Sequence, residues 1–228
     1  MVVRQTCHPF TRFSAPALDT LHETDVPYGD NWDDADEVLH WTESADQKRP
    51  WRTRIRSHIA DQVAKLKSNA RILELGCGPG LLAECILQRC PDLERYTLLD
   101  FSEAMLTLSK RRLGSYSAAA FVQASFKSGD WTCEVDGPFD AVVSMQAVHE
   151  LRHKRHAVAL YEQTRRVLVT PGTLLLCDHT PFDDSLKSAT LYMTEDEQLR
   201  ALADAGFSNV QVSLSLNGLV LYQADANA

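Results

Sequence analysis

The chain has 228 residues, of which 44% are hydrophobic and 24% are charged, with only 10 Gly and 9 Pro. This composition supplies apolar material for one sizeable core and excludes a disordered or collagen-like chain. The formal net charge of -8 argues against nucleic acid as a partner, because a surface that follows phosphates is basic.

The sequence also argues against a membrane protein. No apolar run reaches the roughly 18 residues that a membrane helix requires, and the first residues lack the apolar segment of a secretory signal. The 6 cysteines are scattered without a C-x-x-C pair, which is typical of reduced thiols in an intracellular enzyme. We therefore expect a cytoplasmic protein with neither a membrane nor a nucleic acid as partner.

In chain order, residues 1 to about 50 are predicted to be irregular. Apolar residues at three- and four-residue spacing predict an amphipathic helix over Pro50–Lys67. Strand-like and helix-like patterns then alternate, which indicates βαβ units and an α/β fold with helices on both faces of a parallel sheet. The predicted strands are Arg71–Leu75, Tyr96–Leu99, Ala119–Gln123, Phe139–Met145 and Thr173–Cys177, and the helices between them are Leu81–Arg89, Ala104–Leu113 and Lys154–Leu168.

The end of the chain has a different pattern. A helix over Thr194–Ala205 begins with a capping box and is followed by Gly206, a residue that commonly ends helices. Two apolar runs, Asn209–Leu214 and Leu219–Tyr222, are then separated by a short segment with an Asn-Gly pair. This pair between apolar runs predicts a hairpin, so we expect the sheet to finish with two antiparallel strands.

The densest motif lies where the first strand runs into Gly76, Gly78 and Gly80. Glycines in such a turn let a ligand lie against the backbone, and the helix that follows presents free N–H groups to it. Asp100 stands 20 residues beyond Gly80, at the end of the second strand. A carboxylate in this place can accept both hydroxyls of a ribose.

Two cofactors suit this arrangement. The stretch from Gly78 to Ala83 satisfies the G-x-G-x-x-A form of the dinucleotide fingerprint, so an NAD(P)-binding oxidoreductase is one alternative. The dinucleotide fold normally begins its chain and adds a substrate domain, whereas about 70 residues precede the motif here and a hairpin is expected at the end. These two features argue against NAD(P) as the cofactor, and the second candidate is the one that a family resemblance implies.

Taken together, several motifs resemble a class I S-adenosylmethionine-dependent methyltransferase of the bacterial small-molecule type, over roughly residues 50–225. The similar segments are Glu74-x-Gly76-x-Gly78-x-Gly80, Asp100, the strand Phe139–Val143, Pro171-Gly172-Thr173 and Ala205-Gly206-Phe207. The resemblance implies a three-layer Rossmann-like sandwich with a mostly parallel seven-stranded sheet, in the order 3-2-1-4-5-7-6 with strand 7 antiparallel. It also implies an amino-terminal lid or cap over residues 1–50 and a methyltransferase domain over residues 51–228.

The resemblance further implies that the cofactor is S-adenosyl-L-methionine, and it implies how the protein holds it. The glycine turn would approach its methionine part, Glu74 would orient the turn or the bound amine, and Asp100 would bind the ribose. Relatives often carry an acid for the adenine amino group after the third strand, whereas this chain has Ser125 there, so the hydroxyl or a backbone carbonyl would substitute. The predicted cofactor-binding residues are Glu74, Gly76, Cys77, Gly78, Pro79, Gly80, Asp100, Phe101, Met105, Ser125, Phe126, Met145 and Gln146.

His149 is the predicted catalytic residue. Ligands of such sheets lie beyond the carboxyl ends of the strands, so His149, which follows the fourth strand, should face the sulfonium and the substrate. Methyl transfer is an in-line displacement that needs alignment and, for some nucleophiles, removal of a proton, which an imidazole can accept. His149-Glu150-x-x-His153 is also a zinc-protease motif, but it begins three residues after a predicted strand and not inside a long helix.

The acceptor is expected to be a small molecule. Asp178 and His179 end the fifth strand, and Tyr28 and Trp32 belong to the amino-terminal segment, so these four residues and His149 are the predicted substrate-binding residues. No metal site is expected. A cofactor-binding module without catalysis stays an alternative, and the sequence leaves the acceptor, the methylated atom and the oligomeric state open.

Overall fold

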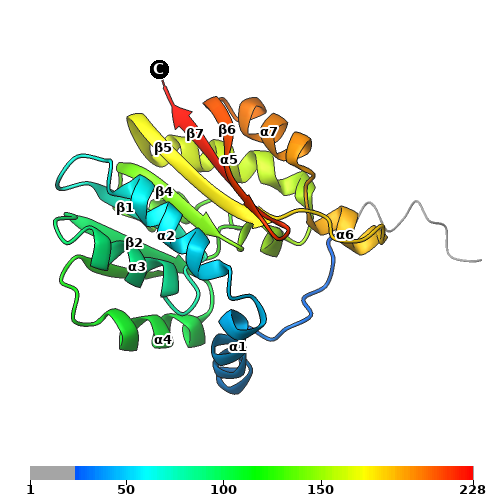
Figure 1. Ribbon diagram of the computed structural model, residues 1–228, viewed down its shortest axis with the longest axis horizontal. Helices are drawn as coiled ribbons and strands as arrows, with labels where there is room; N and C mark the ends of the chain where they lie inside the picture. Colours follow the sequence, from blue (N-terminus) through cyan, green and yellow to red (C-terminus); the bar gives the residue numbers. More distant parts are fainter. Residues whose placement is uncertain (1–23, 228) are drawn as a thin grey trace, which may run out of the picture.

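The structure is a computed structural model that describes residues 24–227. A seven-stranded sheet in the order β3-β2-β1-β4-β5-β7-β6 runs through its centre, with helices on both faces (Figure 1). The strands are β1 (Arg71–Leu75), β2 (Arg95–Asp100), β3 (Ala119–Gln123), β4 (Phe139–Met145), β5 (Leu168–His179), β6 (Ser208–Leu216) and β7 (Leu219–Ala226). The predicted fold class and strand order are therefore confirmed.

Strand pairing divides the sheet into a parallel part and an antiparallel edge. β1 pairs in parallel with β2 and β4, β2 with β3, and β4 with β5. β7 pairs antiparallel with both β5 and β6, as the hairpin predicts. Asn217 and Gly218 both have positive φ in the turn of that hairpin, the backbone conformation that favours Asn-Gly there.

The helices are α1 (Ala35–Lys48), α2 (Arg52–Val63), α3 (Leu81–Arg89), α4 (Glu103–Leu113), α5 (Ala157–Val167), α6 (Leu186–Leu191) and α7 (Glu195–Asp204), with the short 3-10 helices η2 (Trp131–Cys133), η3 (Val148–Leu151) and η4 (Lys154–His156). Among the helices of residues 24–227, none combines the length and apolar character needed to cross a membrane.

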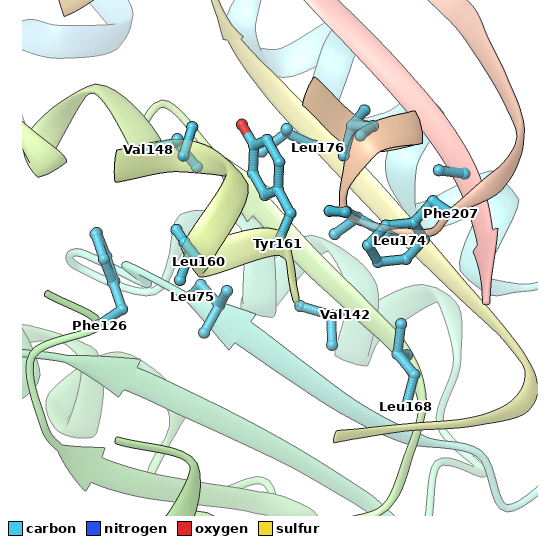
Figure 2. Packing of buried hydrophobic residues seen from close by; sticks show 14 of the residues in the cluster. Leu75, Phe126, Val142, Val148, Leu160, Tyr161, Leu168, Leu174, Leu176 and Phe207 are labelled. Atoms are coloured by element: carbon cyan, nitrogen blue, oxygen red, sulfur yellow. The ribbon is translucent and has the colours of Figure 1, made fainter. Parts of the chain in front are cut away.

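Two apolar layers hold the sheet, one on each face. Apolar side chains of α2, α3 and α4 pack on one face, and those of α5 and α7 pack on the other. Figure 2 shows the second layer, where Leu160 and Tyr161 of α5 lie among strand residues such as Val142 and Leu176. Strands buried on both faces read as continuous apolar runs, which is why the sequence pattern located β1 and β4 to the residue.

The prediction that residues 1 to about 50 are irregular is wrong for α1. Asp34 caps this helix by accepting from the N–H groups of Asp36 and Glu37, and acidic residues in a first turn stabilise the helix dipole. Only Val38 and Ala45 of α1 are buried, so the segment lacks the apolar periodicity that predicts helices. Residues 1–23 of the predicted lid lie outside the described residues.

Three smaller differences concern element bounds. The predicted helix Lys154–Leu168 is shorter, because Lys154–His156 form the 3-10 helix η4 and Leu168 pairs with Phe139 in the sheet. β5 consequently begins before the predicted Thr173, with an irregular register in between. The six-residue α6, capped by Ser185, is too short for its apolar spacing to be recognised in the sequence.

Candidate functional site

A cavity of about 330 Å³ opens at the carboxyl ends of β1, β2, β4 and β5. Each of these strands contributes a polar or sulfur-bearing side chain near its end: Glu74, Asp100, Met145 and His179. Of the predicted site residues, the wall contains Trp32, Glu74, Gly76, Cys77, Gly78, Pro79, Asp100, Phe101, Met105, Phe126, Met145, Gln146, His149 and His179. Gly80, Ser125, Tyr28 and Asp178 are the predicted site residues that are not part of this wall.

The glycine turn joins β1 to α3 with positive φ at Gly76, Gly78 and Gly80. A Cβ at Gly80 would lie 2.6 Å from the Ser109 hydroxyl oxygen, so this glycine permits packing against α4 and does not face the cavity. At Gly78, in contrast, a Cβ would meet only the Met105 sulfur at 4.0 Å. The bare backbone of Gly78 therefore forms a surface on which a ligand can rest.

Asp100 connects the glycine turn to the start of α4. Its Oδ2 accepts from the Gly78 N–H at 2.8 Å and its Oδ1 accepts from the Ser102 N–H at 3.0 Å. Burial raises the pKa of this carboxyl, while the backbone N–H donors oppose that shift. Each carboxylate oxygen can accept more than one hydrogen bond, so Asp100 keeps acceptor capacity toward the cavity that it lines.

Glu74 is the second buried acid of this end of the cavity. Its side chain is 2% exposed and accepts from the Tyr96 hydroxyl at 2.8 Å. Burial, with a smaller contribution from the charge of Asp100, raises its pKa to about 8, although the Tyr96 hydrogen bond lowers it. Glu74 therefore carries its proton for most of the time at neutral pH, and a nearby cation would displace that proton.

His149 lies in η3, just after β4, and Asp178 holds it in two places. The Asp178 carboxylate is 2.7 Å from His149 Nδ1 and also accepts from the backbone N–H of His149 at 3.0 Å. The other ring nitrogen, Nε2, lies 3.4 Å from Glu150 Oε1. Burial lowers the pKa of His149, but Asp178 and then Glu150 outweigh it and raise the pKa to about 10. Asp178 thus positions His149 from behind the cavity wall.

Gln146 adopts a strained backbone conformation, with φ of 59°, that places its side chain in the wall. Its amide nitrogen is 2.7 Å from His179 Nε2. Burial lowers the pKa of His179 to about 4, so His179 is neutral and accepts this hydrogen bond. Gln146 Oε1 is buried and finds no donor within residues 24–227, which leaves an acceptor for a ligand.

The amino-terminal segment crosses the edge of the cavity. The Arg152 guanidinium donates to the carbonyls of Val26 and Pro27 at 3.0 and 2.7 Å. The ring of Tyr28 lies 6.2 Å from that of Phe101 and is half exposed, at 46%. Trp32 lines the cavity and meets Trp41 edge to face. The structure thus places Tyr28 beside the opening and Trp32 in the wall.

Sequence reasoning missed a group of cations in the wall, formed by Arg49, Arg52, Arg56 and Lys187. The three arginines recur at three- and four-residue spacing, which would place them on one face of a helix. That spacing is the signal that could have found them. Leu191, the last residue of α6, and Tyr192, directly after it, also line the cavity and were not predicted.

The comparisons with known proteins agree with this arrangement. A family model described as a methyltransferase domain matches residues 72–172. A highly reducing polyketide synthase of Aspergillus aculeatus, acrA, is 34% identical over 128 residues, which are 54% of this chain and 5% of that protein. The malonyl-acyl-carrier protein O-methyltransferase of Magnetococcus marinus is 32% identical over 101 residues, which are 41% of this chain and 36% of that protein.

Among solved structures, human N-acetylserotonin methyltransferase in complex with S-adenosylmethionine has a TM-score of 0.65 at 17% identity. The match covers 86% of this chain and 57% of that one, and it shows a shared fold. The strand order, the glycine turn and the family match over residues 72–172 make the chain similar to class I methyltransferases, a class whose cofactor is S-adenosylmethionine.

The residues present fit that cofactor. The open backbone at Gly78, the acceptor capacity of Asp100 and the unpartnered oxygen of Gln146 lie in one wall. The Gly78 backbone is complementary to the chain of the methionine part, and Asp100 is complementary to the ribose hydroxyls. The Gln146 oxygen is complementary to a donor such as the ammonium group. Which atom each residue contacts stays a prediction.

The structure differs from the geometry that the dinucleotide fold and the zinc-protease motif, the two alternative interpretations of the sequence, require. The antiparallel β7 inserted between β5 and β6 departs from the all-parallel order of the dinucleotide fold. The zinc-protease motif needs both histidines on one helix, whereas Arg152 has a φ of 68° and separates η3 from η4. His149 and His153 therefore do not share a helix face.

We predict that Asp100→Ala raises the dissociation constant of S-adenosylhomocysteine at least tenfold. Hydrogen bonds to a charged group contribute about 1.5–3 kcal/mol, and about 1.4 kcal/mol corresponds to a factor of ten. Titration calorimetry measures the change. Glu103→Gln, an exposed acid at the start of α4, is the matched control, and equal affinities in the two variants would refute the ribose assignment.

We also predict that binding of S-adenosylhomocysteine near pH 7 releases protons from Glu74. Its pKa of about 8 falls when the ligand ammonium lies beside it, so the acid ionises on binding. Calorimetry in phosphate and in Tris buffer at the same pH separates proton release from binding. The Glu74→Gln variant keeps His149, so it separates proton release by Glu74 from proton release by His149. A Glu74→Gln variant that binds with the same proton release would contradict the assignment.

Proposed function

We propose that the protein transfers a methyl group to a small-molecule acceptor by in-line displacement, with His149 accepting the proton of the acceptor. The observation that carries this proposal is the position of His149. It lies in the same cavity wall as the glycine turn and Asp100, and Asp178 fixes its ring. S-adenosylmethionine held in this cavity would supply a methyl carbon on positively charged sulfur to the lone pair of the acceptor, with S-adenosylhomocysteine as the leaving group.

Asp178 determines which nitrogen of His149 can act. Its contact at Nδ1 keeps a proton on that nitrogen, so Nε2 becomes the acceptor when the ring is neutral. In the free protein the pKa of about 10 makes the imidazolium the main form at neutral pH. A positive charge held in the same cavity lowers this pKa, so cofactor binding favours the neutral base.

The amino-terminal segment is the proposed cover of the site. Its hydrogen bonds to Arg152 and the position of Trp32 in the wall support a lid over residues 1–50, with the catalytic domain over residues 51–228. Exclusion of water by such a lid strengthens electrostatic interactions within the cavity. The cytoplasmic location expected from the sequence stays a prediction.

The acceptor itself is to be found by assay. The bacterial relative is named an O-methyltransferase, so small phenols and carboxylic acids are the first candidates to incubate with methyl-labelled S-adenosylmethionine. Transfer of label to any of them excludes the alternative of a cofactor-binding module without catalysis. Calorimetry with NAD beside S-adenosylhomocysteine tests the oxidoreductase alternative directly.

The next prediction is measured with an acceptor that the assay has identified. We predict that His149→Ala lowers kcat for this acceptor by about 10²–10⁴, the range typical of a lost general base. The dissociation constant of S-adenosylhomocysteine should change less than about twofold. His153→Ala is the control, because the structure places that ring outside the cavity wall. Unchanged turnover of His149→Ala would remove proton transfer by this residue from the mechanism.

The pH dependence gives a separate prediction. A base must lose its proton first, so kcat should rise with pH through an apparent pKa above 6.5, because Asp178 and Glu150 raise the pKa of His149. Asp178→Asn removes the larger of these two charges and should move the profile to lower pH. A profile that is flat, or that stays in place in Asp178→Asn, contradicts this role.

A further inference from the structure

Three rings meet in the cavity wall beside the ends of β4 and β5, and we call this group the aromatic corner. The ring of Tyr192 lies 5.4 Å from that of His149 and 5.5 Å from that of His179, and the two histidine rings lie 5.6 Å apart. Their planes are inclined to one another by 50° to 70°. All three residues line the cavity, so a ligand that reaches this corner meets aromatic surface on more than one side.

The strand order separates the aromatic corner from the predicted cofactor-binding residues. The glycine turn follows β1 and Asp100 ends β2, whereas His179 ends β5. β4 lies between β1 and β5. Neighbouring strands are about 4.8 Å apart, so the end of β5 lies about 10 Å from that of β1 and about 14 Å from that of β2. A cofactor bound at β1 and β2 therefore leaves the end of β5 to a second ligand.

The segment after β5 fixes the position of Tyr192. Ser185 caps α6 by accepting from the Ser188 N–H, and the N–H of Tyr192 donates to the Ser188 carbonyl at 3.0 Å. The ring of Phe182, in the same segment, lies 5.5 Å from that of Tyr192. Phe182 is 70% exposed and is not part of the cavity wall, whereas Tyr192 is half-buried and lines the cavity. Of these two rings, Tyr192 is therefore the one that can contact a ligand in the cavity.

The contact with His149 connects Tyr192 to the reaction. His149 is the proposed base, so the acceptor group that loses its proton must lie within hydrogen-bond reach of that ring. An acceptor bound there lies beside Tyr192, because the two ring centres are 5.4 Å apart. A flat aromatic body can pack offset or edge to face against the tyrosine ring, and such pairs are favourable beyond the apolar area that they bury. A hydrogenated ring of the same size lacks this contribution.

We propose that Tyr192 is a specificity-determining residue that binds the aromatic body of the methyl acceptor. This inference rests on the proposed function and names its substrate class, a flat aromatic molecule whose hydroxyl or amino group projects toward His149. The ring of Tyr192 makes the contact, and its hydroxyl is not required. Tyr192 therefore determines which acceptor binds, while His149 accepts the proton.

The test uses 2-naphthylmethanol as the probe, on the 228-residue chain saturated with S-adenosylhomocysteine. The decahydro analogue of the probe carries the same hydroxymethyl group on a body that is neither flat nor aromatic. This analogue is the more apolar of the two, so transfer from water alone would favour it. We expect 2-naphthylmethanol to bind about fivefold more tightly, which is within the range for aromatic pairs. Titration calorimetry measures both dissociation constants and hence their ratio.

Variants of the chain locate the contact. Tyr192→Leu should reduce the ratio to less than about twofold, and Tyr192→Phe should keep it, because the ring makes the contact. Phe182→Leu removes the neighbouring ring outside the cavity wall and should leave the ratio unchanged. A distorted site would weaken both probes together without changing the ratio. Tyr192→Met replaces the leucine variant if that protein does not fold or does not bind S-adenosylhomocysteine.

Two results would overturn the inference. One is equal affinity of the wild-type complex for the two probes, or no binding of either probe. The other is a ratio in Tyr192→Leu that equals the wild-type ratio, or a ratio that Phe182→Leu reduces as much, since that would assign the preference to the segment and not to Tyr192. Failure of the wild-type protein to bind S-adenosylhomocysteine refutes the proposed function separately, before any acceptor probe is added.

Discussion

The Asp100 carboxylate joins the two loops that form one end of the cavity, and the rest of the site depends on that junction. It accepts from Gly78 in the turn after β1 and from Ser102 at the start of α4. The bonds place a buried acid beside bare backbone, at adjacent strand ends of a parallel sheet. The strand order places β1 beside β2. The loops that follow these two strands are therefore neighbours because of the sheet itself.

The other end of the cavity is organised by charge. Asp178, at the end of β5, holds His149 after β4, so two neighbouring strands again define one pair. Gln146 and His179 form a second contact between the same strand ends. The wall of this one cavity therefore combines buried acids, two imidazoles and several arginines.

Most of the fold could be predicted from the sequence because buried parallel strands and the glycine turn leave unambiguous patterns. β1, β3 and β4 have the predicted bounds, and the hairpin follows from one Asn-Gly pair. α1 could not be predicted, since two buried residues give no periodicity. For the site, most residues of the sequence motifs line the cavity, whereas Gly80 packs against α4 and Asp178 contacts His149 from outside the wall. Motif spacing locates a residue but does not distinguish contact with a ligand from support of a neighbour.

The arginines show why the remaining residues escaped prediction. Arg52 and Arg56 stand one turn apart on the same helix, and nothing in their spacing reveals that Asp46 pairs fully with only one of them. That difference arises from how α1 ends against the start of α2, and α1 was itself unrecognised. Burial without a partner is a property of the folded chain, and it is costly enough to demand an explanation. The difference in pairing between two arginines that the sequence presents as equivalent is therefore visible only in the folded chain.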